Sequence, residues 1–411
     1  MTFSSLTDAF DQPTNRLYEA RDARLKSRRK ILDLISGNVN DHGIAYPATA
    51  LQRVVKEAML KTGHYRPHPL GQARAREAVS RFYRGEGVSI PAPQLVLTPG
   101  TSISYWYCFK LLCDAGDEIL CPAPSYPLFE SIASLSAIKL VSYPLIEAER
   151  WCIDLHELEN KITARTKAIV LISPHNPTGA VATSEEVRGI AEIAARRGLT
   201  IIHDEVFSSF LFSSSPGPIN APHDGSLTKT LGYDKKSSLP RPTDLGAPLV
   251  LTLNGFSKMF ALAGMKIGWI GVTGESARVK RALKALEMIS DTFLPTNEWA
   301  QAAVPGIFTE GASFLQDYRR SVHQRSKTAA ELVKNCKGLS AISPEGGFFM
   351  TVRLGSGMEE EAFAVDLLNQ EGVLIHPGFF YDMPGRHFVM TTVATPAELR
   401  TGFSKIRRLL S

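Results

Sequence analysis

Short apolar runs rich in β-branched residues alternate with amphipathic segments from about residue 46 onward. The apolar runs lie at Leu95–Leu97, Glu118–Cys121, Lys139–Ser142, Ala168–Ser173, Leu199–His203, Leu249–Leu253 and Ile267–Val272. The segments between them show helical spacing of apolar residues, as in Gln72–Tyr83, Ser102–Leu112 and Ser184–Arg197. Continuous apolar strands that alternate with helices are typical of a mostly parallel sheet covered on both faces. The pattern therefore predicts an α/β fold, a three-layer sandwich around that sheet.

The two ends of the chain depart from this alternation. Residues 1–44 are polar, and we expect a helix over Arg16–Ile35. Two long helical patterns follow the sheet region, at Ala277–Ile289 and Asn297–Lys334, and the tail mixes helices with strands. The strands expected in the tail are Gly347–Arg353, Val373–Ile375 and His387–Thr392. We therefore expect a large domain over 45–296 and a smaller α+β domain over 297–411, with an N-terminal arm over 1–44 that forms part of the small domain.

One long stretch, Ser213–Gly246, interrupts the large domain and is rich in Ser, Pro, Gly and Asp. Loops of this length are uncommon in compact domains unless they are functional or disordered. The stretch leaves from the end of the predicted strand Leu199–His203 and returns into the strand Leu249–Leu253, so its roots are expected to flank a site there. We expect either a mobile flap near the mouth of that site or a plain surface excursion.

Charge and polarity exclude several classes of partner. The chain has 411 residues and a net charge of +5, and its basic residues are scattered apart from Arg21–Arg29. That run is typical of a solvated helix face, so we expect no nucleic-acid partner. No apolar stretch reaches the length of a membrane span, and Met1–Asp11 is too polar for a secretory signal. We therefore expect no membrane association.

The cysteines favour a reducing compartment. Their number is odd and no C-x-x-C occurs, which argues against a disulfide scaffold and against a zinc site. The five are Cys108, Cys113, Cys121, Cys152 and Cys336. We expect buried thiols, no bound metal and a cytoplasmic location.

Two ionisable residues stand at the ends of predicted strands. Lys258 follows Leu249–Leu253 within the sequence Asn-Gly-Phe-Ser-Lys, and its neighbours are apolar or small. Desolvation lowers the pKa of a lysine and makes it a candidate Schiff-base nucleophile, although a solvated surface lysine is the ordinary alternative. Asp204 follows Leu199–His203, where a buried carboxylate needs a cationic partner unless it simply caps a helix. A protonated ring nitrogen is one such partner.

Three turns at other strand ends add possible ligand contacts. Gly100, Thr101 and Ser102 lie between a strand and a helix, where backbone and hydroxyl groups can hold a phosphate. Asn176 lies in a Pro-rich turn and offers an amide donor, and Tyr126 offers an aromatic face. Each turn has a plain structural explanation when taken alone. Together they place the chemistry of the chain at one edge of one sheet.

At this point the chain resembles the class I/II aminotransferases of fold type I, which use pyridoxal phosphate. The resemblance covers nearly the whole chain, from Gly37 to Arg386. Its ordered motifs are the glycine–hydroxyl turn, Pro-x-Tyr, Asn-Pro-x-Gly, Asp-x-x-aromatic, Ser-Lys and a later Gly-x-x-x-Gly-Trp. Bacterial alanine-type transaminases look most similar, because of the segments 123–129 and 161–170. The resemblance implies a homodimer with active sites at the subunit interface.

The resemblance also implies a role for each matching residue. Lys258 would hold the cofactor as a Schiff base and then move a proton, and Asp204 would keep the ring nitrogen protonated. Asn176 would bind the phenolic oxygen of the ring and border the substrate, while Tyr126 would stack on the ring face. The phosphate would be bound by Gly100, Thr101, Ser102, Ser257 and Lys266, together with Tyr65 of a neighbouring subunit. Arg386 would grip the substrate α-carboxylate, and Gly37 would let the substrate lie against the backbone.

Three positions depart from the pattern of the family. Phe207 stands where a tyrosine usually donates a hydrogen bond to the phenolic oxygen. Lys266 stands where an arginine is usual, so a planar phosphate clamp becomes a point charge. Tyr65 lies one residue further from Gly71 than the usual spacing.

The resulting hypothesis is an aminotransferase that exchanges an amino group between an L-amino acid and a 2-oxo acid by a ping-pong reaction. A lyase or cyclase acting on an amino acid through the same carbanion is the alternative, because both need Lys258 and Asp204. A regulator that senses the cofactor is disfavoured, since residues 1–44 hold no DNA-binding pattern. The sequence leaves the amino donor and acceptor unassigned.

Overall fold

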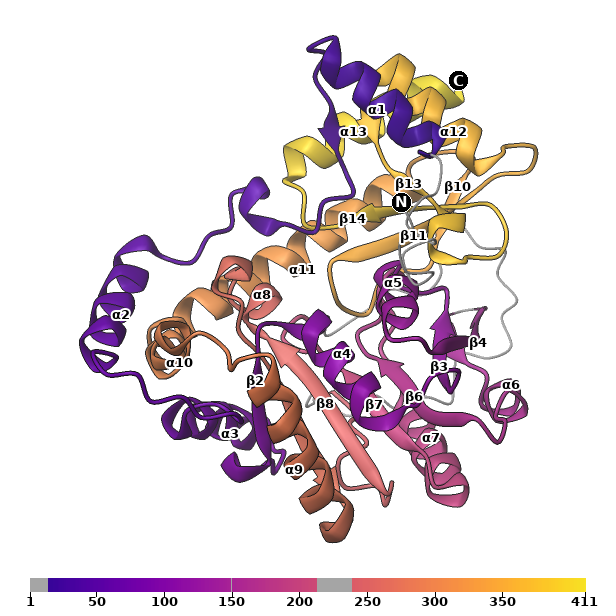
Figure 1. Ribbon diagram of the computed structural model, residues 1–411. Helices are drawn as coiled ribbons and strands as arrows, with labels where there is room; N and C mark the ends of the chain where they lie inside the picture. The colour runs from indigo at the N-terminus through magenta and orange to yellow at the C-terminus, as the bar shows by residue number, and fades with distance from the viewer. Residues whose placement is uncertain (1–13, 149, 213–238) are drawn as a thin grey trace, which may run out of the picture.

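The structure, a computed structural model, describes residues 14–148, 150–212 and 239–411. Within these residues the largest sheet has eight strands, in the order β2–β9–β8–β7–β6–β3–β4–β5 (Figure 1). Their bounds are β2 Leu95–Thr98, β9 Gly268–Gly274, β8 Leu249–Gly255, β7 Thr200–Asp204, β6 Thr166–Ile172, β3 Glu118–Ala123, β4 Lys139–Glu147 and β5 Trp151–Ile153. Apart from β9 and β5, the strands run in one direction. The predicted α/β class with a mostly parallel sheet is confirmed.

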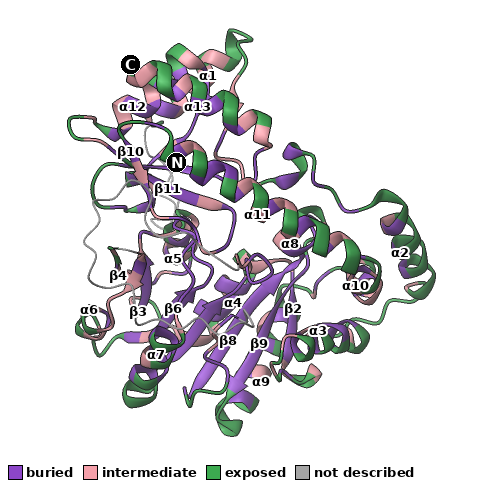
Figure 2. Cartoon of the chain, turned by 180° about the vertical axis from the view of Figure 1, so that it is seen from behind, coloured by how far each residue is buried: buried purple, intermediate pink, exposed green. Residues whose placement is uncertain are grey.

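Helices cover both faces of this sheet. One face packs against α4 (Thr101–Leu112), α5 (Leu128–Leu135) and α9 (Ser276–Thr292). The other packs against α3 (Ala73–Gly85), α6 (Leu155–Asn160), α7 (Ser184–Arg197) and α10 (Glu298–Glu310). Successive side chains of a strand alternate between faces, so both sets need apolar residues. Val96 thus joins the first layer and Leu97 the second, and the strands are buried throughout their middle (Figure 2).

The second unit is a four-stranded sheet in the order β10–β11–β14–β13, with helices packed against it. The bounds are β10 Leu339–Ala341, β11 Phe349–Leu354, β14 His387–Thr391, β13 His376–Pro377, α1 Arg16–Lys26, α12 Glu360–Asp366 and α13 Pro396–Leu410. Leu17 and Leu34 of the N-terminal segment lie in its core, as do residues near the C-terminus. The division into domains at 44/45 and 296/297 remains a prediction.

The remaining helices connect these parts. They are α2 (Ala48–Lys61), which packs on α10, the short α8 (Phe256–Met259) and the long α11 (Ala312–Lys334). Helix α11 contributes Tyr318 to the core beside the large sheet and Val333 to the core of the second unit. It therefore ties the two sheets together, as its path in Figure 1 shows.

Two predicted helices are shorter than expected. The helix that begins at Arg16 ends at Lys26, and β1 (Leu32–Asp33) then pairs with β12 (Val373–Leu374), which leads Leu34 into the core. The pattern Asn297–Lys334 forms two helices that meet at Gly311. A Cβ at Gly311 would lie 2.5 Å from the carbonyl oxygen of Ile307, so the chain changes direction where only glycine fits.

Most of the predicted stretch Ser213–Gly246 lies outside the described residues. Its described end begins at Leu239, which is buried, and continues through Arg241 into β8. Among the described residues, no helix combines the length and the apolar character that crossing a bilayer demands.

Candidate active site

Within the described residues, the carboxyl ends of six strands lie at one edge of the large sheet. Asp204, the last residue of β7, lies opposite Ile172 of β6 and Leu253 of β8. Strand β9 begins at this same edge, because Gly268 lies opposite both Thr98 of β2 and Gly255 of β8. Ligands of open α/β sheets bind at this edge. Apart from Tyr65, the predicted cofactor-binding residues of this chain lie on strand ends and turns at this edge.

Lys258 lies in α8, directly after β8. Its Nζ donates a hydrogen bond to the carbonyl oxygen of Gly37 at 3.3 Å. The rings of Phe207 and Phe348 lie around it, with centroids 5.9 and 5.8 Å from Nζ. Burial among these groups lowers the pKa of Lys258, and no carboxylate in the described part of the chain opposes that effect. The environment therefore shifts the equilibrium of Lys258 in the direction of the neutral, nucleophilic amine.

Asp204 is buried, with 8% of its surface exposed. Tyr105 of α4 donates its hydroxyl to Oδ2 at 2.8 Å, and the amide of Val206 donates to Oδ1 at 2.9 Å. Burial raises the pKa of Asp204 to about 6, although both hydrogen bonds oppose the rise. Neither of these partners carries a positive charge. The carboxylate is therefore suited to a cationic group of a ligand.

Tyr105 is a residue that the sequence did not single out. It lies one turn into α4, behind the glycine–hydroxyl turn, and it is fully buried. Burial, and then the neighbouring Asp204 carboxylate, raise the pKa of Tyr105 well above its usual value, so its hydroxyl remains a donor. A buried tyrosine hydroxyl needs a polar partner, and this need is the one signal that could have identified Tyr105.

The predicted phosphate-binding residues converge around Gly100 and Gly268. Gly100 has φ +123° and begins α4, so the free amides of the first helical turn face the sheet edge. A Cβ on Gly268 would lie only 2.9 Å from the Cα of Gly100, which shows how closely the two turns pack. Ser257 follows the end of β8 and Lys266 precedes the start of β9, where Gly255 pairs with Gly268. Thr101 and Ser102 are the first two residues of α4.

Tyr126 and Asn176 lie on the neighbouring strand ends. Tyr126 follows β3 and is 43% exposed. Burial, and then the charge of Asp204, raise the pKa of Tyr126, which places the phenol within electrostatic reach of that carboxylate. Asn176 follows β6, and its buried Oδ1 has no hydrogen-bond partner among the described residues. Phe207 lies beside Lys258 and is 3% exposed.

A pyridoxal phosphate fits the chemistry of these residues. The buried Asp204 has no cationic hydrogen-bond partner among the described residues, and the Gly100 turn leaves space where a side chain would stand. When bound, the cofactor supplies an electron sink for the carbanion of an amino acid. Lys258, Asp204 and Asn176 would hold its ring, and the turns at Gly100 and Lys266 would hold its phosphate.

Two predicted residues do not join this group in the chain. The carbonyl of Arg386 accepts a hydrogen bond from Leu354 at 2.8 Å, at one end of β11, whereas Phe349 contacts the Gly37 side of the site from the other end. Five residues separate the two ends, which is about 16 Å of strand. Arg386 is exposed there, so its expected contact with the substrate carboxylate is not supported. Tyr65 is 76% exposed and lies on the connection between α2 and α3.

The comparisons with known proteins agree with this geometry. Residues 29–406 match the family described as aminotransferase class I and II. The chain belongs to this family. It is a pyridoxal-phosphate-dependent transaminase, and no observation favours the alternative of a lyase or cyclase. The family assignment made from the ordered motifs is confirmed.

Alanine-type aminotransferases are among the similar proteins. The glutamate-pyruvate aminotransferase AlaA of Escherichia coli is 30% identical, with 97% of this chain and 96% of that protein covered. The alanine aminotransferase of Mycobacterium tuberculosis is 26% identical, with 96% and 90% covered. Among solved structures, an aminotransferase from Escherichia coli has a TM-score of 0.83 at 28% identity, covering 100% and 98% of the chains. The alanine aminotransferase of Pyrococcus furiosus has a TM-score of 0.87 at 23% identity, covering 100% and 99%, and shows the shared fold.

Proposed function

We propose that this aminotransferase moves the amino group of alanine, or of a similarly small amino acid, to a 2-oxo acid, with Lys258 as the cofactor-binding lysine. The observation that carries the proposal is the partly buried Nζ of Lys258. It lies at the same sheet edge as Asp204, whose carboxylate has no cationic hydrogen-bond partner among the described residues. The names of the relatives from Escherichia coli and Mycobacterium tuberculosis support the alanine class.

Lys258 and Asp204 divide the chemistry between them. The lowered pKa of Lys258 favours an amine that can attack a carbonyl and can later take up and return a proton at Nζ. Asp204 is held by Tyr105 and Val206 and would present its carboxylate to the ring nitrogen. The backbone at Gly37 borders the lysine, and a Cβ there would lie 2.8 Å from the ring of Phe349. The absence of a side chain at Gly37 therefore allows the ring of Phe349 to pack against the backbone next to Nζ.

The phosphate and ring contacts complete the proposed site. Thr101 and Ser102 offer hydroxyls beside the free amides of α4, and Ser257 and Lys266 approach from the strands opposite. These groups bind an anion through several weak contacts, since Lys266 supplies a single point of charge in place of a planar clamp. Tyr126, which is 43% exposed, would cover the ring, and Asn176 would supply its amide.

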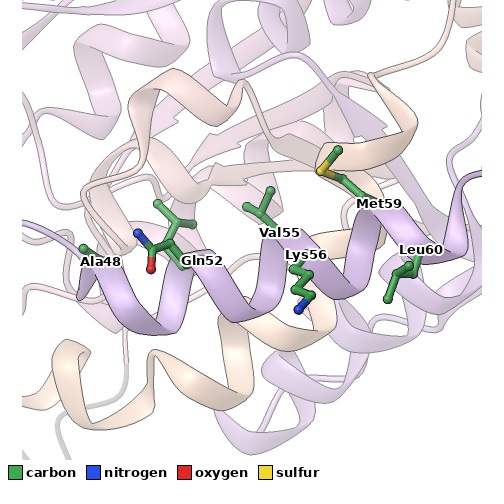
Figure 3. Close-up of a pocket in the computed structure, with 7 residues that line it drawn as sticks. Ala48, Gln52, Val55, Lys56, Met59 and Leu60 are labelled. Carbon is green, nitrogen blue, oxygen red and sulfur yellow. The ribbon is translucent and has the colours of Figure 1, made fainter.

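We also propose a homodimer. Helix α2 presents apolar side chains to solvent along a surface groove of about 730 Å³ (Figure 3). Its exposed members include Met59 at 50% and Leu60 at 79%. A second hollow, next to Tyr65, is bordered by Leu294 and Trp299, which are 70% and 54% exposed. Exposed apolar surfaces of this kind are typical of an interface, and a second copy of the chain is the occupant that would bring Tyr65 to a neighbouring phosphate.

The five cysteines support a cytoplasmic location. All five are unpaired in the structure, and burial raises the pKa of Cys108, Cys113 and Cys121. Buried thiols that form no disulfide are typical of proteins from a reducing compartment.

Two measurements test this function. Borohydride reduction of the loaded protein should fix the cofactor on the peptide that contains Lys258, and Lys258→Ala should lose both the adduct and turnover. Purified protein should then convert alanine and a 2-oxo acid to pyruvate and a new amino acid. An adduct on another lysine would contradict the assignment of Lys258. Release of carbon dioxide or of a side-chain group without formation of a new amino acid would indicate the lyase alternative.

A further inference from the structure

Two carboxylates stand side by side at the end of β7. Asp204 is followed by Glu205, whose side chain has no exposed surface. Successive side chains of an extended chain point to opposite faces, and the amide of Glu205 continues the pairing by donating to Leu253 at 3.0 Å. Asp204 consequently faces Tyr105 on α4, while Glu205 faces Asn254, whose Nδ2 donates to its Oε1 at 3.1 Å. Asp204 can therefore serve the cofactor only while the side chain of Glu205 is held on the opposite face of the sheet.

Arg241 holds Glu205 on that opposite face. Its Nε donates to Oε2 of Glu205 at 2.5 Å, and the two side chains are 4% and 0% exposed. Although burial opposes it, the charge of Glu205 raises the pKa of Arg241. Arg241 belongs to the segment that leads into β8, the strand that ends before Lys258. The ion pair thus joins the end of the Asp204 strand to the chain that enters the Lys258 strand.

The other polar groups on this face supply no positive charge. Burial lowers the pKa of His203 to about 3, and the positive Arg241 adds to the effect, so the imidazole is neutral. Burial, and then the charge of Glu205, raise the pKa of Tyr83 well above its usual value, so its hydroxyl is neutral too. Asn254 divides its amide between Glu205 and Ser208, each at 3.1 Å. Among the described residues, Arg241 is therefore the cation that balances Glu205.

We infer that Arg241 is a positioning residue for Asp204: by pairing with Glu205 behind the sheet, it fixes the direction in which the Asp204 carboxylate faces the cofactor. The inference rests on the proposed function of Asp204. A buried carboxylate that loses its cation is strongly unfavourable. Without Arg241, the free energy of the protein falls when the Glu205 carboxylate turns toward water. That movement rotates the end of the strand and turns Asp204 away from Tyr105.

The test is a titration of the apoprotein with pyridoxal phosphate, read by absorbance, with the unfolding temperature measured beside it. Arg241→Met should weaken cofactor binding at least about tenfold and change the absorbance spectrum of the bound cofactor. Arg241→Lys, which keeps the charge, should bind more tightly than Arg241→Met. The double variant Arg241→Met with Glu205→Gln should return to within about threefold of the wild-type affinity, because no charge remains to be expelled. If Arg241→Met alone does not fold, the cofactor affinity of the double variant still tests the inference.

Lys167→Met is the matched control, because Lys167 pairs with Asp117 at 3.6 Å near the opposite ends of the strands. This variant should leave cofactor affinity unchanged. An Arg241→Met protein with a lowered unfolding temperature but wild-type affinity and spectrum would overturn the inference, and so would a double variant that binds no better than Arg241→Met. Wild-type protein that forms no borohydride-stable adduct on Lys258 would overturn the proposed function as well.

Discussion

At the scale of single residues, the burial of Asp204 works against the stability of the apoprotein. Its pKa of about 6 in the fold exceeds the value of about 4 in an unfolded chain. A raised carboxyl pKa means that the folded state binds the proton more tightly, so stability is lost as pH rises from about 4 to about 6 and stays constant above that range. A difference of about 2 in pKa corresponds to about 3 kcal/mol in the free energy of unfolding. The site therefore costs stability until a cation occupies it.

This argument predicts that Asp204→Asn stabilises the apoprotein relative to wild type as pH rises. The asparagine does not ionise, so the difference in free energy of unfolding should grow by about 3 kcal/mol between pH 4 and pH 6 and then level off. Urea unfolding of both apoproteins at several pH values measures it. A difference that stays the same at every pH would show that Asp204 ionises in the fold as it does in water. Cofactor binding should be lost in the same variant.

Tyr105→Phe tests the group that holds Asp204 from the side of α4. The substitution removes the 2.8 Å hydrogen bond to Oδ2 and keeps the ring, so packing against Phe129 should persist. Hydrogen bonds to charged groups contribute about 1.5–3 kcal/mol. We expect cofactor affinity to fall about tenfold, measured by the same titration of apoprotein. Tyr107→Phe on the same helix is the control and should bind the cofactor normally.

The residues that sequence reasoning found and missed differ in a physical way. Lys258 and Asp204 follow apolar strands, so their common edge could be predicted from the pattern alone. Arg386 was assigned by resemblance, and the sequence cannot say which end of a strand reaches the site. The register places Thr391, not Arg386, beside Phe349. Arg241 lies within the long stretch Ser213–Gly246, where no spacing rule connects it with Glu205.

At the scale of elements, the site depends on how closely turns from different strands approach one another. Strand β9 runs against its neighbours, and this reversal brings its first residue between the turn before α4 and the turn before α8. Glycine at 255 and 268 allows the contact: a Cβ on Gly255 would lie 2.7 Å from the carbonyl oxygen of Ile267. The sequence predicted the α/β class but not the order or direction of each strand, because buried parallel and antiparallel strands have the same apolar pattern.

Gly268→Ala is predicted to disturb the phosphate-binding turn from behind. The added methyl would lie 2.9 Å from the Cα of Gly100 and 3.1 Å from Oγ1 of Thr98, so the turn must move. We expect a loss of about 1–3 kcal/mol in the free energy of unfolding, together with weaker binding of the cofactor. Gly85→Ala is the control, because nothing lies within 4 Å of its added Cβ. Equal behaviour of the two variants would show that the contact at Gly100 is not tight.

At the scale of the molecule, the site lies where the two sheets meet. Gly37 comes from the N-terminal segment, Lys258 from the large sheet and Phe349 from the small one, and these three residues are in contact. Gly179, after the Asn176 turn, accepts hydrogen bonds from Glu345 and Gly346. A relative movement of the two sheets would therefore change the width of the substrate space. Neither unit holds the site alone.

The apolar face of α2 leads to the last prediction, that Leu60→Glu yields a monomer. Leu60 is 79% exposed in the chain and borders the proposed interface, so the substitution places a charge where apolar surface should be buried. Burial of a leucine contributes about 1.5–3 kcal/mol, which corresponds to at least tenfold weaker association. Light scattering after size exclusion measures the mass. Leu25→Glu on α1, at a side chain 56% exposed, is the control and should remain a dimer.

The proposed position of Tyr65 adds a second readout to that variant. If its hydroxyl serves the phosphate of the neighbouring subunit, separation of the subunits removes a ligand from both sites, and cofactor affinity should depend on protein concentration. Tyr65→Phe should weaken cofactor binding while the mass remains that of a dimer, because the ring stays in place. A monomeric Leu60→Glu protein with full affinity would place every cofactor contact within one chain, and Tyr65 would then have no role in binding.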